Sequence, residues 1–288
     1  MRIHIVNYEI GMPPGILTKY ADSMARELLA LGHDVTVSVQ PRSDVQVNHH
    51  INYIAYRGHP GLNTLMVTHL SGDAHLGSAE KLAILEKGLL TAHGICFSDD
   101  LASRLHDRYG MLSQLLHVVL PAHDDLPPKR KVVAIVSNTN PDGRKREEWV
   151  LHLVKRLDRR HWRFEIMGRG WERIANEMDE CVPTFYENQF NADGYPQLLK
   201  RADFLLYPGG EDEGAMSVLD AAHVGLRTIA PNVGFHEKLR VTHAFCNLDE
   251  LVEIFKKLER SPVADWTWRR YAEEHLKIWQ EMLTRPTP

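Results

Sequence analysis

The sequence lacks the features of a secreted or membrane-spanning protein. None of its apolar runs approaches the roughly 20 residues that cross a bilayer. Its first residues, MRIHIVNYEI, hold one Arg and a short strand-like run but no small-residue cleavage site, unlike a signal peptide. The three cysteines, Cys96, Cys181 and Cys246, are far apart and lack metal-site spacing. We therefore expect a protein of the reducing cytoplasm.

An excess of positive charge is also missing. The net charge is −4, and residues 1–125 account for it with 9 Lys and Arg against 13 Asp and Glu. This half offers no electrostatic hold on a nucleic-acid backbone. The histidines His49, His50 and His59 lie in polar, turn-rich sequence without metal-ligand spacing, and we expect them to be solvated.

The most informative stretch is residues 202–237, ADFLLYPGGEDEGAMSVLDAAHVGLRTIAPNVGFHE. It predicts a buried strand at 204–207, a Gly-rich acidic turn at 209–214 and a helix at 215–224. Gly225 then ends the helix, and a second strand follows at 226–230. This is one strand–helix–strand unit of a parallel sheet.

The turn in this unit combines two kinds of binding group. The free N–H groups and the positive end of the following helix suit a pyrophosphate. The carboxylates of Glu211, Asp212 and Glu213 would repel phosphate, so we expect them to accept hydrogen bonds from sugar hydroxyls beside it. Phosphate and sugar together indicate a nucleotide sugar.

This order of strand, acidic Gly turn, L-D-A helix, Gly and strand resembles the donor site of retaining glycosyltransferases of family 4, which have the GT-B fold. In that family two glutamates eight positions apart bracket the turn, and Asp212 and Asp220 hold that spacing here. The resemblance implies that Asp212 or Glu213 holds the transferred sugar and that Asp220 reaches the ribose. It also places Gly214, Ala215 and Met216 against the donor.

The rest of the chain fits two Rossmann-like domains. Alternating strands and helices at 1–125 predict an N-terminal, acceptor-side domain, and the Pro-containing segment 126–131 predicts a linker. We expect a donor domain at 132–265. In GT-B proteins the two parallel sheets face each other across a cleft and the last helix returns to the first domain, which is the role expected for residues 266–288.

The resemblance also implies further site residues. Gly15 would lie near the donor phosphates and His69 in the catalytic crevice, although each also fits a purely structural role. Arg144 and Lys145, at the start of a helix expected at 145–157, would clamp the donor diphosphate; a solvated basic helix face is the alternative. Gly168 and Arg169 would contact the nucleotide.

The expected function is therefore transfer of a sugar from a nucleoside-diphosphate sugar to an acceptor hydroxyl, with retention of anomeric configuration. No Asp-x-Asp triplet occurs, so we expect neither a metal nor another cofactor. The acceptor stays open among a saccharide, a lipid-linked group, a protein or a modified base. The alternatives are a nucleotide-sugar epimerase, a phosphorylase, or a non-catalytic GT-B protein that binds a nucleotide or a partner; a glycosidase ranks lower.

Overall fold

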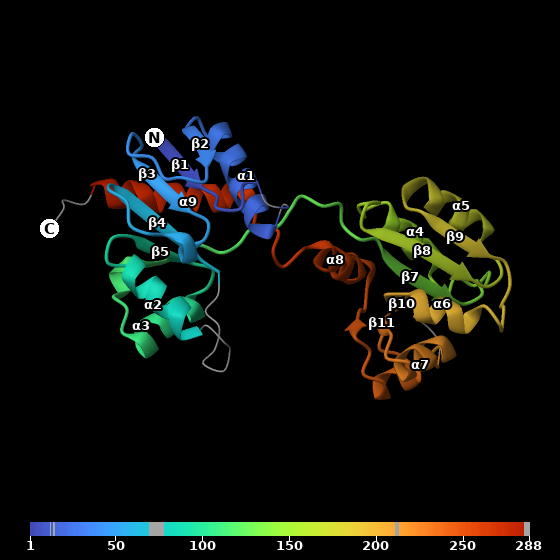
Figure 1. The fold of residues 1–288 in the computed structure, drawn as a ribbon. Helices are drawn as coiled ribbons and strands as arrows, with labels where there is room; N and C mark the ends of the chain where they lie inside the picture. Colours follow the sequence, from blue (N-terminus) through green and yellow to red (C-terminus); the bar gives the residue numbers. More distant parts are fainter. Residues whose placement is uncertain (12, 14, 69–77, 211–212, 285–288) are drawn as a thin grey trace. The chain divides into compact units, whose positions relative to one another are not determined.

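The computed structural model describes residues 1–11, 13, 15–68, 78–210 and 213–284, and it divides into two compact units (Figure 1). The first unit joins Met1–Asp125 to Val263–Pro288, and the second is Leu126–Pro262. Each unit contains one six-stranded sheet in which neighbouring strands run parallel. The prediction of an α/β chain with two parallel sheets is confirmed.

The first sheet has the strand order β2-β1-β3-β4-β5-β6. Its strands are β1 (Arg2–Val6), β2 (Asp34–Ser38), β3 (Val47–His50), β4 (Leu62–Val67), β5 (His93–Cys96) and β6 (Leu116–Val118). The helices of this unit are α1 (Ile16–Ala30), α2 (Ser78–Gly88), α3 (Asp99–Tyr109) and α9 (Trp268–Thr284), with short 3-10 turns at Tyr53–Ala55 and Ser113–Leu115.

Helix α9 belongs to the core of the first unit, although it lies at the far end of the sequence. Trp268, Tyr271 and Trp279 are buried in one cluster with residues of β1 and α1. The indole N–H of Trp279 donates to Thr64 Oγ1 on β4 at 3.2 Å, and that of Trp268 donates to Asp124 at 3.0 Å. The helix thus completes the apolar face of this sheet.

Strand β3 was not predicted, and the expectation that His49 and His50 are solvated is wrong. Both side chains are fully buried in the middle of the sheet. His49 Nδ1 lies 2.9 Å from Thr64 Oγ1 and His50 Nδ1 lies 2.8 Å from Tyr8 Oη, whereas His49 Nε2 has no hydrogen-bond partner among the described residues. The polar sequence Asn48-His49-His50 therefore forms a central strand by hydrogen bonding rather than by apolar content.

The second sheet has the order β12-β11-β10-β7-β8-β9. Its strands are β7 (Lys131–Val136), β8 (Trp162–Met167), β9 (Thr184–Glu187), β10 (Phe204–Leu206), β11 (Arg227–Ala230) and β12 (His243–Ala244). Its helices are α4 (Glu147–Val154), α5 (Glu172–Cys181), α6 (Tyr195–Arg201), α7 (Met216–His223) and α8 (Leu248–Glu259), with a 3-10 turn at Gly234–Lys238.

The helices of the second unit cover both faces of this sheet. Alternate residues of β7 point to opposite sides: Val133 and Ile135 pack in the cluster that contains α4, α5 and α8, whereas Ala134 packs with α6 and α7. The chain adds β8 and β9 on one side of β7, and β10, β11 and β12 on the other. This reversal of direction leaves a crevice at the carboxyl ends of β7 and β10, which lie side by side. Among the described residues, no helix is both long and apolar enough to span a bilayer.

The first unit should lose stability in mild acid because it buries neutral histidines. Burial lowers the pKa of His275 from 6.5 to about 4, against a hydrogen bond to the Tyr271 carbonyl that raises it, and burial lowers the pKa of His49 well below 6.5. The unfolded chain therefore binds more protons between pH 6.5 and 4. For His275, stability is fully present above pH 6.5 and falls by roughly 3 kcal/mol as the pH drops toward 4.

Urea unfolding at a series of pH values checks this. His275→Gln should reduce the slope of unfolding free energy against pH in that window, whereas His123→Gln, at an exposed histidine of the same unit, should keep the wild-type slope. An unchanged slope in His275→Gln would contradict the assignment.

Candidate functional site

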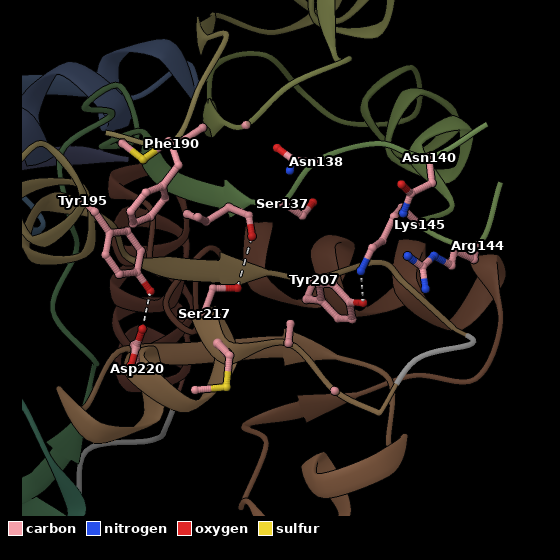
Figure 2. Close-up of a pocket in the computed structure, with 16 residues that line it drawn as sticks. Ser137, Asn138, Asn140, Arg144, Lys145, Phe190, Tyr195, Tyr207, Ser217 and Asp220 are labelled. Atoms are coloured by element: carbon pink, nitrogen blue, oxygen red, sulfur yellow. Dashed lines mark hydrogen bonds between the residues drawn. The ribbon is translucent and has the colours of Figure 1, made fainter. Parts of the chain in front are cut away.

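A cavity of about 580 Å³ opens in the second unit at the carboxyl ends of β7, β8 and β10 (Figure 2). It lies at the point where the strand order reverses, which is where open α/β sheets bind ligands. Loops after the strands and the first turn of α7 supply its walls. The lining residues are Val136, Ser137, Asn138, Asn140, Arg144, Lys145, Met167, Gly168, Phe190, Tyr195, Tyr207, Gly214, Ala215, Met216, Ser217 and Asp220.

One end of the cavity is cationic. Lys145 Nζ donates to the hydroxyl of Tyr207 at 2.9 Å and lies 5.1 Å from the centre of that ring. The side-chain amide of Asn140, turned so that its oxygen faces Arg144, accepts from Nε and Nη2 of the guanidinium at 3.0 Å. Two positive side chains are thus held in place at the wall of one cavity.

Lys145 does not begin helix α4, as was predicted, but precedes it. Gly143 has φ +71° and Arg146 has φ +50°, so the backbone is left-handed at two residues before the helix begins at Glu147. Left-handed backbone is costly for a residue with a side chain, and such strain gathers at functional sites. These two residues place Arg144 and Lys145 in a loop at the cavity instead of on the helix surface.

Arg146 fixes the glycine turn that follows β10. Its guanidinium stacks on the Trp149 ring with 4.3 Å to the centroid, and it occupies the space that a Cβ on Gly210 would need. Gly210 N also donates to the Arg144 carbonyl at 3.2 Å. A Cβ on Gly209 would meet the Tyr207 hydroxyl in the same way. A Cβ at Gly210 would thus require the Arg146 side chain to move, and one at Gly209 would require the Tyr207 ring to move.

The first turn of α7 forms the middle of the cavity wall. Gly214 has φ +111°, and the next N–H, of Ala215, donates to His236 Nε2 at 2.8 Å. Because His236 Nδ1 donates to the Pro231 carbonyl at 3.0 Å, this buried ring is neutral with its proton on Nδ1. Helix α7 begins at Met216, so the positive end of its dipole and its first N–H groups, which have no partner within the helix, lie at Met216 and Ser217. This arrangement suits an anion.

The other end of the cavity is aromatic and carries a carboxylate. Phe190 is 58% exposed, and its ring centroid lies 5.3 Å from that of Tyr195. The Tyr195 hydroxyl donates to Asp220 Oδ2 at 2.8 Å. Figure 2 shows this end across the cavity from Lys145 and Arg144, with Ser217 and Ser137 between. The cavity is thus positively charged at one end and aromatic, with one carboxylate, at the other.

Most of the predicted donor-site residues of the second unit come together here: Arg144, Lys145, Gly168, Gly214, Ala215, Met216 and Asp220. Glu213 and Arg169 are exposed and are not among the lining residues; the Arg169 N–H instead holds Asn138 Oδ1 at 2.8 Å. His69 and Asp212 lie outside the described residues.

Gly15 lies in the first unit, just before helix α1. The first turn of this helix already has an anion, because Glu9 Oε2 accepts from the N–H and the hydroxyl of Thr18 at 3.3 and 3.1 Å. A Cβ on Gly15 would lie 3.0 Å from the same oxygen. The chain's own carboxylate therefore lies beside Gly15, the residue that the resemblance places near the donor phosphates.

Sequence reasoning missed several lining residues, above all Tyr207, Tyr195 and Phe190. Tyr207 directly follows β10, so its place at the carboxyl end of a predicted strand was a usable signal. Phe190 comes from the β9–α6 connection and Tyr195 is the first residue of α6, and no motif marks them. Within the described part of the chain, no group of three or more His, Cys, Asp or Glu side chains could hold a metal ion.

No protein-family model matches this chain, and no curated protein matches it in sequence. Solved structures that it resembles include WaaG, a glycosyltransferase involved in lipopolysaccharide biosynthesis, at 13% identity with 98% of each chain covered and a TM-score of 0.39. Another is HepE from Anabaena in complex with UDP and glucose, at 14% identity, 98% of each chain and a TM-score of 0.37.

A third is the sucrose-phosphate synthase of Thermosynechococcus elongatus, at 12% identity, with 98% of this chain and 99% of that chain covered and a TM-score of 0.40. Similarity at this level is too low to indicate a function, so the function is argued from the residues of the cavity.

Replacing Gly168 by alanine should destabilise the second unit for two reasons, a strained backbone angle and a steric clash. Gly168 has φ +143°, and a Cβ there would overlap the Ser137 carbonyl oxygen. We expect Gly168→Ala to lower the unfolding free energy by about 3 kcal/mol, combining backbone strain and a clash. Gly225→Ala is the control, because Gly225 has φ +76° but open space for a Cβ. Urea unfolding should show a clearly smaller loss there; equal losses would mean that the clash relaxes.

Proposed function

We propose that the cavity of the second unit binds a nucleoside-diphosphate sugar and that the protein transfers the sugar to an acceptor hydroxyl. The observation that supports this best is the order of groups along one cavity: two cations, a helix N-terminus, then a carboxylate beside aromatic rings. A nucleoside diphosphate has the matching order of diphosphate, ribose and base. Neither a free phosphate nor a simple sugar would use all three parts.

The diphosphate would lie between the first turn of α7 and the cationic end. Lys145 and Arg144 would neutralise the charge that grows on the diphosphate as the bond to the sugar breaks. Each is held by a neighbour, Lys145 by the Tyr207 hydroxyl and Arg144 by Asn140, so little reorganisation is needed during the reaction. On this proposal the reaction needs no metal ion, because fixed cations and the helix dipole stabilise the leaving group.

The nucleoside would lie at the opposite end. Asp220 would accept hydrogen bonds from the ribose hydroxyls, and the exposed ring of Phe190 offers a face on which a base can stack. The transferred sugar would extend past Gly214 toward the acidic turn, where Glu213 or Asp212 would hold its hydroxyls. Assignment of Asp212 and of His69 as catalytic rests on the family resemblance alone.

Family membership, retention of configuration and the GT-B arrangement of the two units belong to the same proposal, as does a cytoplasmic location. One observation favours a second candidate, a nucleotide-binding protein without transferase activity: the Glu9 carboxylate already caps α1 beside Gly15, where the resemblance implies donor phosphates.

Binding of the donor should stabilise the protein in a way that depends on Lys145. At about 100 times its dissociation constant, a ligand adds roughly 2.7 kcal/mol of stability, which raises the melting temperature. We expect one of UDP, GDP, ADP or CDP to raise it with or without a chelator, and Lys145→Ala to abolish the shift. Lys256→Ala is the control, since Lys256 lies on α8 away from the cavity. No shift with any nucleotide would remove the basis of the proposal.

The transferase should release nucleoside diphosphate from its sugar donor and keep the anomeric configuration in the product. Proton NMR of the product formed from an α-linked donor should show an α-linked sugar. Glu213→Gln and Asp212→Asn should separate the two acids, because the one that holds the sugar should lose turnover by about 100-fold or more while nucleotide binding stays. Nucleotide binding without any turnover of the sugar donors would favour the second candidate.

A further inference from the structure

A hydrogen-bonded pair of side chains lies in the wall shared by two cavities of the second unit. Tyr195 and Asp220 line the cavity described above, and they also line a second cavity of about 660 Å³ between α6 and α7. Tyr195 Oη donates to Asp220 Oδ2 at 2.8 Å across this wall. Within the described residues, no other group is bonded to the Asp220 carboxylate. Its second oxygen, Oδ1, is left for a ligand.

The loop before Tyr195 holds the tyrosine in this place. Asn191 Nδ2 donates to Glu187 Oε1 at the end of β9 at 2.8 Å, and Asn191 Oδ1 accepts from the N–H groups of Asp193 and Gly194 at 3.1 and 3.0 Å. The N–H of Tyr195 donates to the Asn191 carbonyl at 2.9 Å. A series of hydrogen bonds from Glu187 at the end of β9 through Asn191 therefore fixes the backbone that carries the Tyr195 hydroxyl.

When one oxygen of an aspartate is held by a hydrogen bond, the other oxygen has a fixed direction in which it can accept a hydrogen bond from a ligand. Asp220 is half-buried at the side of α7, and rotation about its Cβ–Cγ bond would otherwise turn either oxygen away from the cavity. Burial and the bond to the Asp220 carboxylate raise the pKa of the Tyr195 hydroxyl, so the tyrosine stays protonated and keeps donating. The pair then presents a preorganised acceptor at the aromatic end of the cavity.

We propose that Tyr195 is a positioning residue that aims the Asp220 carboxylate at the ribose hydroxyls and thereby makes the site selective for ribonucleotides. This inference rests on the proposed function, because it assumes a nucleoside diphosphate in the cavity. It assigns the tyrosine no contact with the reacting bond. The selectivity comes from a hydroxyl on α6 that restrains a carboxylate on α7.

The test compares nucleotides with and without ribose hydroxyls. Calorimetric titration of the full chain with UDP, GDP and ADP, and with their 2′,3′-dideoxy forms, gives a selectivity ratio for each protein. We expect the wild type to bind the best ribonucleotide at least tenfold more tightly than its dideoxy form. Tyr195→Phe should reduce this ratio about tenfold by weakening the ribonucleotide alone, since a hydrogen bond to a charged group has about this value.

Tyr186→Phe is the matched control, because it removes a hydroxyl of the same unit that lies outside the cavity, where it donates to Asn188 Oδ1 at 2.8 Å and accepts from the Trp171 N–H at 3.3 Å. It should leave the ratio unchanged, whereas Asp220→Asn should lower it as Tyr195→Phe does. Combining Tyr195→Phe with Asp220→Asn should add nothing further, because both act through one carboxylate.

The outcomes separate the inference from the proposed function. If the wild type binds a ribonucleotide but Tyr195→Phe weakens both ligand forms equally, or changes neither, the positioning role is wrong and the nucleotide site stands. A wild type that binds without preference for ribose also overturns the inference. If no nucleotide binds the wild type, the proposed function itself fails.

Discussion

The parallel pairing of β7 with β10 is the constraint on which the rest of the second unit depends. Residues 131–187 extend the sheet on one side of β7, and residues 204–244 extend it on the other. The connections from these two strands leave toward opposite faces, so side chains cannot fill the space between them. The cationic loop and the first turn of α7 both line this space, because the loop lies in the connection after β7 and α7 is the next helix after β10.

Close packing of glycine turns keeps this crevice in shape. The turn after β10 lies so near the loop before α4 that Gly210 has no room for a side chain beside Arg146. At the other side of α7, Gly234 lies against the Glu213 carbonyl, which accepts the Phe235 N–H at 2.9 Å. Backbone contacts therefore hold the described residues on both sides of the acidic turn, Gly210 and Glu213.

The strand–turn–helix unit at 202–237 could be predicted because its signals are local: an apolar run, a Gly-rich turn and a helix stop occur within 36 residues. The wall that Tyr195 forms with Asp220 could not, because its partners are 25 positions apart on different helices and only Asp220 belongs to a motif. Strand β3 was missed for a related reason. Its histidines are polar by sequence, and the partners that offset the cost of burying them, Thr64, Asn63 and Tyr8, come from other parts of the chain.

The place of α9 in the first unit has a consequence for biosynthesis. The second unit is continuous in sequence, so all of its strands and helices leave the ribosome before Val263. The first unit must wait for Trp268, Tyr271 and Trp279, which close its apolar face. During translation the second unit can therefore complete its core first, while the earlier-made sheet keeps part of its surface uncovered and open to chaperones until the last helix emerges.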